Sequence, residues 1–378
     1  MKYSIFILFV FVFSAESCHE KLNHNIENYP NLPIQHYNYE SLPDERDINF
    51  FRFANFQRLT INFGKLSPDY NPVSNAGATL GRVLFYDKNL SFNNTISCGS
   101  CHSQKNSFVD NLDFSPGFQG EFALRNTPSV LNVGFQNSYF WDGREIRLED
   151  MVLGPIQNHI EMGIDKIENL ENKLASLPYY PDLFLKAFGT KEVNTERISK
   201  ALAQFLRATV SFKAKIDNKE NHFTLLEELG FSVFNIKAGC VECHAGVNFK
   251  GYDEVAKNTS KVSSFANIGL EMEYKDPGLG KYQVFKDGHF KVPGLRNIAL
   301  TGPYMHDGRF KTLDEVIEHY NSGVKDHPYL SFGMKNVHGK VKRLNLSQLE
   351  KDALRAFLHT LTDYSILNDQ RFSNPFVN

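Results

Sequence analysis

Apolar residues recur at helical spacing in several stretches of the chain. Within residues 196–212, Ile198, Leu202, Phe205 and Leu206 fall on one face of a helix. Residues 225–236 show a similar pattern. Another apolar stripe follows Ser347 and Glu350, whose spacing is typical of a capping box at the start of a helix. The pattern predicts a mainly α-helical fold with long irregular connections, and we interpret the apolar stripes as core.

The N-terminus carries a different apolar pattern. A basic start precedes an apolar run over residues 3–13, and small residues follow before Cys18. This order is typical of an export signal, and the run is short for a membrane-spanning helix. We expect residues 1–17 to be a signal peptide and residues 18–43 to be a tether or lead-in. Cleavage after residue 17 and lipidation of Cys18 remain alternatives, so the expected location is the periplasm, with or without a lipid anchor.

Size and charge narrow the function classes. The chain has 378 residues, of which 42% are hydrophobic and 22% are charged, which is enough for a sizeable core and most naturally for two domains. Its formal net charge of -2 provides no basic field for nucleic acid or an anionic membrane surface. Small molecules and other proteins are the expected partners, and the sequence leaves homodimer formation open.

Two Cys-x-x-Cys-His motifs carry the clearest chemistry. They contain four of the five cysteines, and in each motif a histidine follows directly. The histidine and the duplication distinguish them from a redox disulfide or half a zinc site. In such a motif two thiols add to the vinyl groups of one haem and the histidine binds its iron. The sequence therefore predicts two covalently attached haem c groups. Their predicted thioether residues are Cys98, Cys101, Cys240 and Cys243, and their proximal ligands are His102 and His244.

An internal repeat accompanies these motifs. Similar strings recur at a constant offset of 165 residues, from Pro128 to Pro293 and from Tyr139 to Tyr304. We interpret the repeat as two tandem c-type cytochrome domains, each built around one haem. The predicted boundaries are residues 44–219 for an N-terminal peroxidatic haem domain and residues 220–378 for a C-terminal electron-transfer haem domain.

The repeat also makes the two haems unequal. Tyr320 in the second copy is a candidate sixth iron ligand, whereas the equivalent position in the first copy is Pro155, which has no ligating side chain. The first haem is therefore expected to have an open face, unless a histidine such as His159 closes it. Peroxide chemistry at an open haem needs an acid/base group, and Glu161 lies in the segment that replaces the missing ligand. Its alternative role is that of a solvated surface carboxylate.

Together these features resemble the bacterial dihaem cytochrome c peroxidase family, which includes MauG-type enzymes. The resemblance covers residues 75–362 and rests on ordered strings around both haem motifs, including Tyr-Phe-Trp-Asp-Gly-Arg at 139–144 and Gly-Pro-Ile-Gln at 154–157. It implies that Glu161 is the catalytic distal glutamate and that Trp141 relays electrons between the haems. It also implies a calcium ion between the domains, held at Asn126, Thr301 and Pro303.

The chain departs from the family pattern at three positions. Many members have a histidine where this chain has Phe118, and its loss predicts a first haem that is open in every redox state. Tyr320 matches the MauG-type ligand, whereas many peroxidases have methionine there; a phenolate favours ferric iron and predicts a lower reduction potential. Met151 takes the place of the usual distal glutamine, which puts one polar contact to peroxide in doubt.

Three functions follow from this resemblance and these departures. The first is a peroxidase that reduces hydrogen peroxide with electrons from a small cytochrome c or copper protein. The second is a MauG-type enzyme that oxidises residues of a partner protein, which Tyr320 and the missing histidine favour. The third is a plain electron-transfer dihaem cytochrome, in which Pro155, Phe118 and Glu161 would have no purpose. Peroxide turnover of a reduced cytochrome distinguishes the first from the others.

Overall fold

The computed structural model describes residues 29–42, 66–218, 220–251 and 264–376. The predicted signal peptide, Cys18 and most of the predicted tether lie outside these residues. Within them the chain is mainly helical, and its strands β1 (Phe265–Ala266) and β2 (Phe290–Lys291) form one short antiparallel pair. The mainly α prediction with long irregular connections is confirmed. None of the described helices is both long and apolar enough to cross a membrane.

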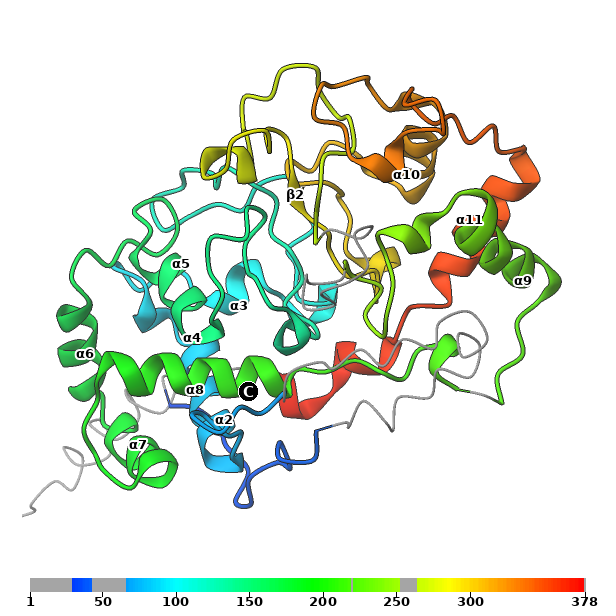
Figure 1. Cartoon of the computed structure of the whole chain (residues 1–378). Helices are drawn as coiled ribbons and strands as arrows, with labels where there is room; N and C mark the ends of the chain where they lie inside the picture. The colour runs from blue at the N-terminus through cyan, green and yellow to red at the C-terminus, as the bar shows by residue number, and fades with distance from the viewer. Residues whose placement is uncertain (1–28, 43–65, 219, 252–263, 377–378) are drawn as a thin grey trace, which may run out of the picture.

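Helices α2 and α8 form the centre of the first half of the molecule, with α6 and α7 beside them (Figure 1). The second half packs α9 against α11, and α10 lies above them. Short helices α3, α4 and α5 stand along the irregular connections between α2 and α6. The bounds are α2 Asn75–Tyr86, α3 Cys98–Cys101, α4 Leu148–Met151, α5 Leu153–Gln157, α6 Ile167–Ala175, α7 Tyr180–Phe188, α8 Thr195–Ala208, α9 Leu225–Ser232, α10 Leu313–Glu318 and α11 Gln348–His359.

The helices predicted from periodicity are present with small differences at their ends. Helix α8 ends at Ala208, a few residues before the predicted end. The predicted segment at 225–236 divides into α9 and a π-helical turn, η6, at Val233–Lys237. The capping box of α11 is confirmed, because Ser347 accepts from the Glu350 N–H and the Glu350 carboxylate accepts from the Ser347 N–H.

The two helix pairs cross through the same kind of contact. A Cβ atom on Gly81 of α2 would lie 2.0 Å from the carbonyl oxygen of Ala201 in α8. A Cβ atom on Gly230 of α9 would lie 1.9 Å from the carbonyl oxygen of Ala353 in α11. Only glycine lets the helix backbones approach this closely. The two halves are therefore built around equivalent helix crossings.

The repeat at an offset of 165 residues recurs in the backbone as well. Asn132 and Asn297 both adopt left-handed conformations, with φ of 56° and 61°. The Tyr139 N–H donates to the carbonyl of the residue six positions on at 2.7 Å, and the Tyr304 N–H does the same at 2.7 Å. These matches support the proposal of two tandem domains.

In the described part of the chain two hydrophobic clusters make up the core, and the boundary between them falls between Ala208 and Ala214. The first cluster also contains Ile366 and Phe372 from the C-terminal segment, which lies beside α2 and α8 in Figure 1. The end of the chain thus crosses back from the second half to the first. The domain boundary at residues 219 and 220 stays a prediction, and the C-terminal segment ties the two halves together.

Candidate active site

One large cavity connects the two halves. Its volume is about 1030 Å³, at the upper end of the range of roughly 300–1,000 Å³ found for small-molecule pockets. Both Cys-x-x-Cys-His motifs line it, so segments that are far apart in sequence face a common space. The other predicted residues on its wall are Asn126, Trp141, Met151, Pro155, His159, Glu161, Thr301, Pro303 and Tyr320.

The two motif histidines are oriented in the same way. Nδ1 of His102 lies 3.1 Å from the carbonyl oxygen of Phe108, and Nδ1 of His244 lies 2.9 Å from the carbonyl oxygen of Phe249. Because a carbonyl only accepts hydrogen bonds, each Nδ1 carries the proton and each Nε2 keeps its lone pair. Burial lowers the pKa of both imidazoles, which favours this neutral form. Both histidines are thereby prepared to bind a metal through Nε2.

The four motif cysteines are free thiols in the structure. Burial is the main cause that raises the pKa of Cys98 to about 12, and Cys101 and Glu161 contribute to the same shift. Burial likewise raises the pKa of Cys240 to about 12, with a smaller contribution from Cys243. Such thiols are protonated and unreactive as nucleophiles at neutral pH. The raised pKa values therefore disfavour redox exchange at these pairs, and their place on the cavity wall suits them to hold a group there.

Glu161 is held by the turn that follows α5. The Phe118 N–H donates to the Glu161 carbonyl oxygen at 2.9 Å, and the Met162 N–H donates to the Pro155 carbonyl oxygen at 3.1 Å. A Cβ atom on Gly117 would lie 1.6 Å from the Ile160 carbonyl oxygen, so the neighbouring strand of chain passes too closely for any residue but glycine. The backbone of Glu161 is thus fixed on both sides.

Opposing influences set the pKa of the Glu161 carboxyl group. Burial raises the pKa of its carboxyl group, while Arg144 and a 2.7 Å hydrogen bond donated by Asn158 Nδ2 lower it, and the net direction is upward. Arg144 is itself oriented by the Asp142 carboxylate at 2.9 Å and by the ring of Phe140. A half-buried carboxylate with a raised pKa that lines the cavity is suited to exchange protons with a ligand there.

Tyr320 belongs to the other motif. It lies in a π-helical turn, η10 (His319–Gly323), which extends α10 and shifts the direction of the side chains there. Burial raises the pKa of the Tyr320 phenol well above its ordinary range, and charges on Cys243 and Cys240 contribute to the shift. The preceding His319 is engaged elsewhere, with Nε2 3.0 Å from the Ile268 carbonyl oxygen. Tyr320, rather than His319, therefore faces the second motif.

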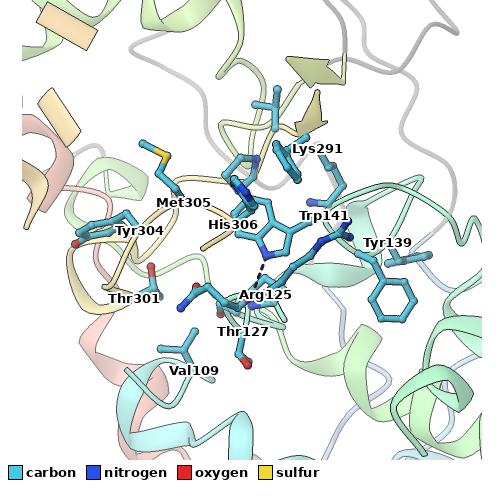
Figure 2. A pocket seen from close by; sticks show the side chains of 18 of the residues that line it. Val109, Arg125, Thr127, Tyr139, Trp141, Lys291, Thr301, Tyr304, Met305 and His306 are labelled. Atoms are coloured by element: carbon cyan, nitrogen blue, oxygen red, sulfur yellow. Dashed lines mark hydrogen bonds between the residues drawn. The ribbon is translucent and has the colours of Figure 1, made fainter. Parts of the chain in front are cut away.

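Trp141 contacts both halves of the molecule. Its indole Nε1 donates to the Asn126 carbonyl oxygen at 2.8 Å, the bond drawn as a dashed line in Figure 2, and its own carbonyl oxygen accepts from the Lys291 N–H at 2.8 Å. His306, which lines the same part of the cavity in Figure 2, stacks on Phe290 with ring centroids 3.7 Å apart. The indole is therefore fixed where the two halves meet.

The three residues of the predicted calcium site all line the cavity. Nδ2 of Asn126 donates to the carbonyl oxygens of Leu112 and Asp113, at 2.8 and 3.3 Å. This fixes the amide so that the other side-chain atom, Oδ1, is the acceptor. In the described part of the chain no group of three or more His, Cys, Asp or Glu residues is placed to hold a metal ion. A cation here would therefore depend on amide and carbonyl oxygens.

Phe118 does not line the cavity. Its ring packs against Phe92, with centroids 5.8 Å apart, and against Gly163, where an added Cβ atom would lie 2.4 Å from the ring. The ring is therefore packed between Phe92 and Gly163 and forms no part of the cavity wall beside Cys98. Pro155 and the exposed His159 do line the cavity. Pro155, Met151 and Glu161 together form the cavity wall near the first motif.

Sequence reasoning gave no role to three polar residues on the cavity wall. Asn158 and Arg144 act on the Glu161 carboxylate, as described above. Asn248 is 5% exposed, and neither its Oδ1 nor its Nδ2 has a hydrogen-bond partner among the residues that the structure describes. A buried amide without partners is costly and points to a missing polar group in the cavity. The sequence contains a signal for Asn158, because this residue lies three positions before Glu161. It contains no such signal for Asn248.

Comparison with known proteins identifies the family. A family model described as di-haem cytochrome c peroxidase matches residues 75–222. The methylamine utilization protein MauG of Methylorubrum extorquens is 34% identical over 303 residues, which cover 78% of this chain and 80% of that protein. The cytochrome c551 peroxidase of Nitrosomonas europaea is 37% identical over 251 residues, covering 64% and 71%.

A solved structure agrees with these sequence matches. The crystal structure of a MauG-like protein associated with microbial copper homeostasis superposes with a TM-score of 0.73 at 32% identity, and it covers 84% of this chain and 100% of that one. Sequence and structure thus agree over most of the chain. The protein belongs to the di-haem cytochrome c peroxidase family, whose named members include both cytochrome c peroxidases and MauG proteins.

Proposed function

We propose that the protein is a cytochrome c peroxidase with two unequal haems. It reduces one hydrogen peroxide to two waters, taking up two electrons and two protons. The electrons come one at a time from a small cytochrome c or copper protein. The observation that carries the proposal is a cavity that joins both motifs, with Glu161 beside the first and Tyr320 beside the second.

The residues on the cavity wall fit the two haem c groups that the family implies. Thioether bonds would form at the four free thiols, and His102, His244 and Tyr320 would bind iron. The unpartnered amide of Asn248 would gain a polar partner from a haem edge. The bound haems supply iron that binds peroxide at the first site and stores electrons at the second.

Glu161 supplies the acid/base step. Its ionised carboxylate takes a proton from the peroxide oxygen that binds at the first site, and the resulting acid returns the proton to the departing oxygen, which leaves as water. The upward shift of its pKa brings the group closer to the pH at which both directions of transfer are efficient. Asn158 holds the carboxylate in place for both transfers.

Trp141 is proposed to relay electrons between the two sites. Replacing it with phenylalanine removes the indole and its bond to the Asn126 carbonyl while keeping an aromatic ring. We expect intact haem spectra and a slower transfer of electrons from the second haem to the first, measured by flash or stopped-flow spectroscopy. Tyr139→Phe, a neighbouring change on the cavity wall, is the control. An unchanged transfer rate in Trp141→Phe would make the indole a packing residue only.

The electron donor is proposed to dock beside the second motif. Exposed apolar side chains gather there on two loops, and we call them the apolar patch: Tyr282, Val284, Phe285, Tyr329 and Phe332. Phe285 and Tyr329 lie with ring centroids 5.8 Å apart, and a Cβ atom on Gly333, next to Phe332, would lie 3.9 Å from Cys243 Sγ. Exposed apolar surface of this kind marks protein interaction sites.

Further features belong to the same proposal. Export to the periplasm follows from the N-terminal apolar run, with Cys18 as the site of an optional lipid anchor. Calcium is proposed at Asn126, Thr301 and Pro303, where the oriented amide supports an oxygen-ligated cation. A homodimer stays a prediction from sequence.

Stopped-flow spectroscopy of the dihaem protein with peroxide tests the proposal. In the presence of a reduced small cytochrome we expect steady oxidation of that cytochrome at a rate that follows the peroxide concentration. A long-lived state with two oxidising equivalents and negligible cytochrome turnover would favour the MauG-type function, which Tyr320 supports. Two low-spin haems in electron paramagnetic resonance and no reaction with peroxide would leave the plain electron-transfer function.

A further inference from the structure

Two tyrosines share one buried carboxylate in the first half of the molecule. The hydroxyl groups of Tyr179 and Tyr180 both donate to Oδ2 of Asp87, at 2.8 and 2.7 Å. The other oxygen of Asp87 accepts from the backbone and side-chain nitrogens of Asn89, each at 2.8 Å. Asp87 is 3% exposed and Tyr180 is fully buried. The carboxylate is thus held in place as the hydrogen-bond acceptor of two phenols.

This group lies next to the first haem motif. Asp87 caps the C-terminal end of α2, which packs against both α3, the helix of the motif, and α7, which begins at Tyr180. Tyr86, the residue before Asp87, touches the motif directly, because a Cβ atom on Gly99 would lie 2.4 Å from its ring. Tyr180 also belongs to the same hydrophobic cluster against which Cys98 packs. Tyr180 therefore lies near Cys98 in space, although the two are far apart in sequence.

The aromatic rings continue from the buried site to the surface. The centroids of Tyr180 and Tyr179 are 4.7 Å apart, and those of Tyr179 and Tyr29 are 5.5 Å apart. Tyr29 is 44% exposed. The three tyrosines therefore form a continuous series from the neighbourhood of the first haem motif to solvent, and we call them with Asp87 the tyrosine relay.

Other buried tyrosines nearby have a different kind of partner. The Tyr86 hydroxyl donates to the Phe372 carbonyl oxygen at 2.7 Å, and the Tyr39 hydroxyl donates to the Arg371 carbonyl oxygen at 2.6 Å. A carbonyl oxygen accepts a hydrogen bond but is too weak a base to take the proton. A carboxylate can take it. Oxidation of a phenol releases its proton, so Tyr179 and Tyr180 are easier to oxidise in place than Tyr86 or Tyr39.

We propose that the tyrosine relay carries oxidising equivalents from the first haem to the protein surface when the cytochrome or copper donor is absent. This rests on the proposed peroxidase function, because the oxidant is the haem at His102 after its reaction with peroxide. The relay protects the haem cavity from its own oxidant. The final electron comes from a small phenolic or ascorbate-like reductant in solution.

Each transfer balances in electrons and protons. Tyr180 gives an electron to the oxidised haem and its phenolic proton to Asp87. Tyr179 then gives an electron to the Tyr180 radical and a proton to Asp87, while Asp87 returns the first proton to Tyr180. Tyr29 reduces the Tyr179 radical and releases its proton to water, and Asp87 reprotonates Tyr179. The reductant in solution restores Tyr29 with one electron and one proton.

The test uses the dihaem protein mixed with peroxide in the absence of an electron donor. Freeze-quenched samples are examined by electron paramagnetic resonance, and a nitroso spin trap followed by peptide mass spectrometry locates the radical. We expect a tyrosyl signal in the wild-type protein and trap adducts at Tyr29 or Tyr179. The double variant Tyr179→Phe/Tyr180→Phe should lose the signal and bleach its haem faster under repeated peroxide additions. Its turnover with reduced cytochrome should stay unchanged.

Tyr86→Phe is the matched control, since it removes a buried hydroxyl that is bound to a carbonyl. It should keep the tyrosyl signal. Asp87→Asn, which keeps both rings and removes the base, should lose the signal. Oxidation of the haem without any tyrosyl signal, or a signal that survives in the double variant, would overturn the relay alone. No change in the haem spectrum on adding peroxide would overturn the peroxidase proposal, and the relay with it.

Discussion

Replacing Glu161 with glutamine is expected to slow the reaction with hydrogen peroxide by about a hundredfold or more, in line with typical contributions of roughly 10²–10⁴-fold from general acid/base catalysis. Glutamine has nearly the same shape and can still accept the hydrogen bond from Asn158 Nδ2, which is 2.7 Å long in the wild-type protein. It cannot take up the peroxide proton. The second-order rate constant from stopped-flow mixing measures the effect.

Asp165→Asn is a suitable control for this variant. Asp165 is exposed and lies four residues after Glu161 in the same connection, so its replacement also removes one negative charge without changing the cavity wall. Its rate with peroxide should match the wild-type rate. If Glu161→Gln reacts as fast as this control, then the carboxylate has no part in proton transfer.

The pH profile gives a second readout on Glu161. The group takes up the peroxide proton only when ionised, so the wild-type rate should rise with pH through its pKa. Burial raises that pKa above the ordinary range of a glutamate, against the opposing influences of Arg144 and Asn158. The rise should therefore lie at higher pH than for an exposed glutamate. In Glu161→Gln the rise should disappear.

Local chemistry explains which features the sequence could predict. The Cys-x-x-Cys-His spacing is a requirement of one haem and needs no knowledge of the rest of the fold, and the capping box at Ser347 is equally local. Glu161 could be proposed because the internal repeat pointed to a missing ligand in its segment and the family resemblance then implied its role. In each case the information lies within a few residues or in a comparison of two aligned strings.

The features that could not be predicted are contacts between distant segments. Asp87 meets Tyr179 and Tyr180 more than ninety positions away, and no periodicity links them. Phe372 returns to the first core although it follows the second half of the chain. Asn248 is polar and buried and has no hydrogen-bond partner in the described residues, a property that depends on the surrounding cavity and not on any sequence pattern. Such contacts depend on packing, which a single sequence does not encode in any local pattern.

Replacing Arg207 with methionine is expected to lower the free energy of unfolding by about 3–5 kcal/mol, the usual cost of leaving a buried charge without its partner. Arg207 and Glu149 form a two-pronged ion pair between α8 and α4, with N–O distances of 2.7 and 3.1 Å, and the two side chains are 5% and 4% exposed. Asn71 Nδ2 adds a 2.6 Å bond to the same carboxylate. Denaturant unfolding followed by circular dichroism measures this loss of stability. Arg197→Met is the control, and it should change stability much less because the Arg197–Glu192 pair is partly exposed.

The pH dependence shows whether the lost stability comes from the stranded carboxylate. Burial alone would raise the pKa of Glu149, but Arg207 and Asn71 reverse the shift and lower this pKa. The wild-type pair therefore stabilises the fold at pH values above the ordinary glutamate pKa. This stability is lost as the pH falls through the lowered pKa. Without Arg207, burial has the larger effect on the pKa of Glu149, and protonation of its carboxylate becomes favourable. The difference in unfolding free energy between Arg207→Met and wild type should therefore shrink towards acidic pH.

The double variant Arg207→Met/Glu149→Leu should recover much of the lost stability, because two apolar side chains replace the whole pair. A loss that is the same at every pH and in the double variant would instead indicate that the arginine side chain stabilises α8 by packing alone.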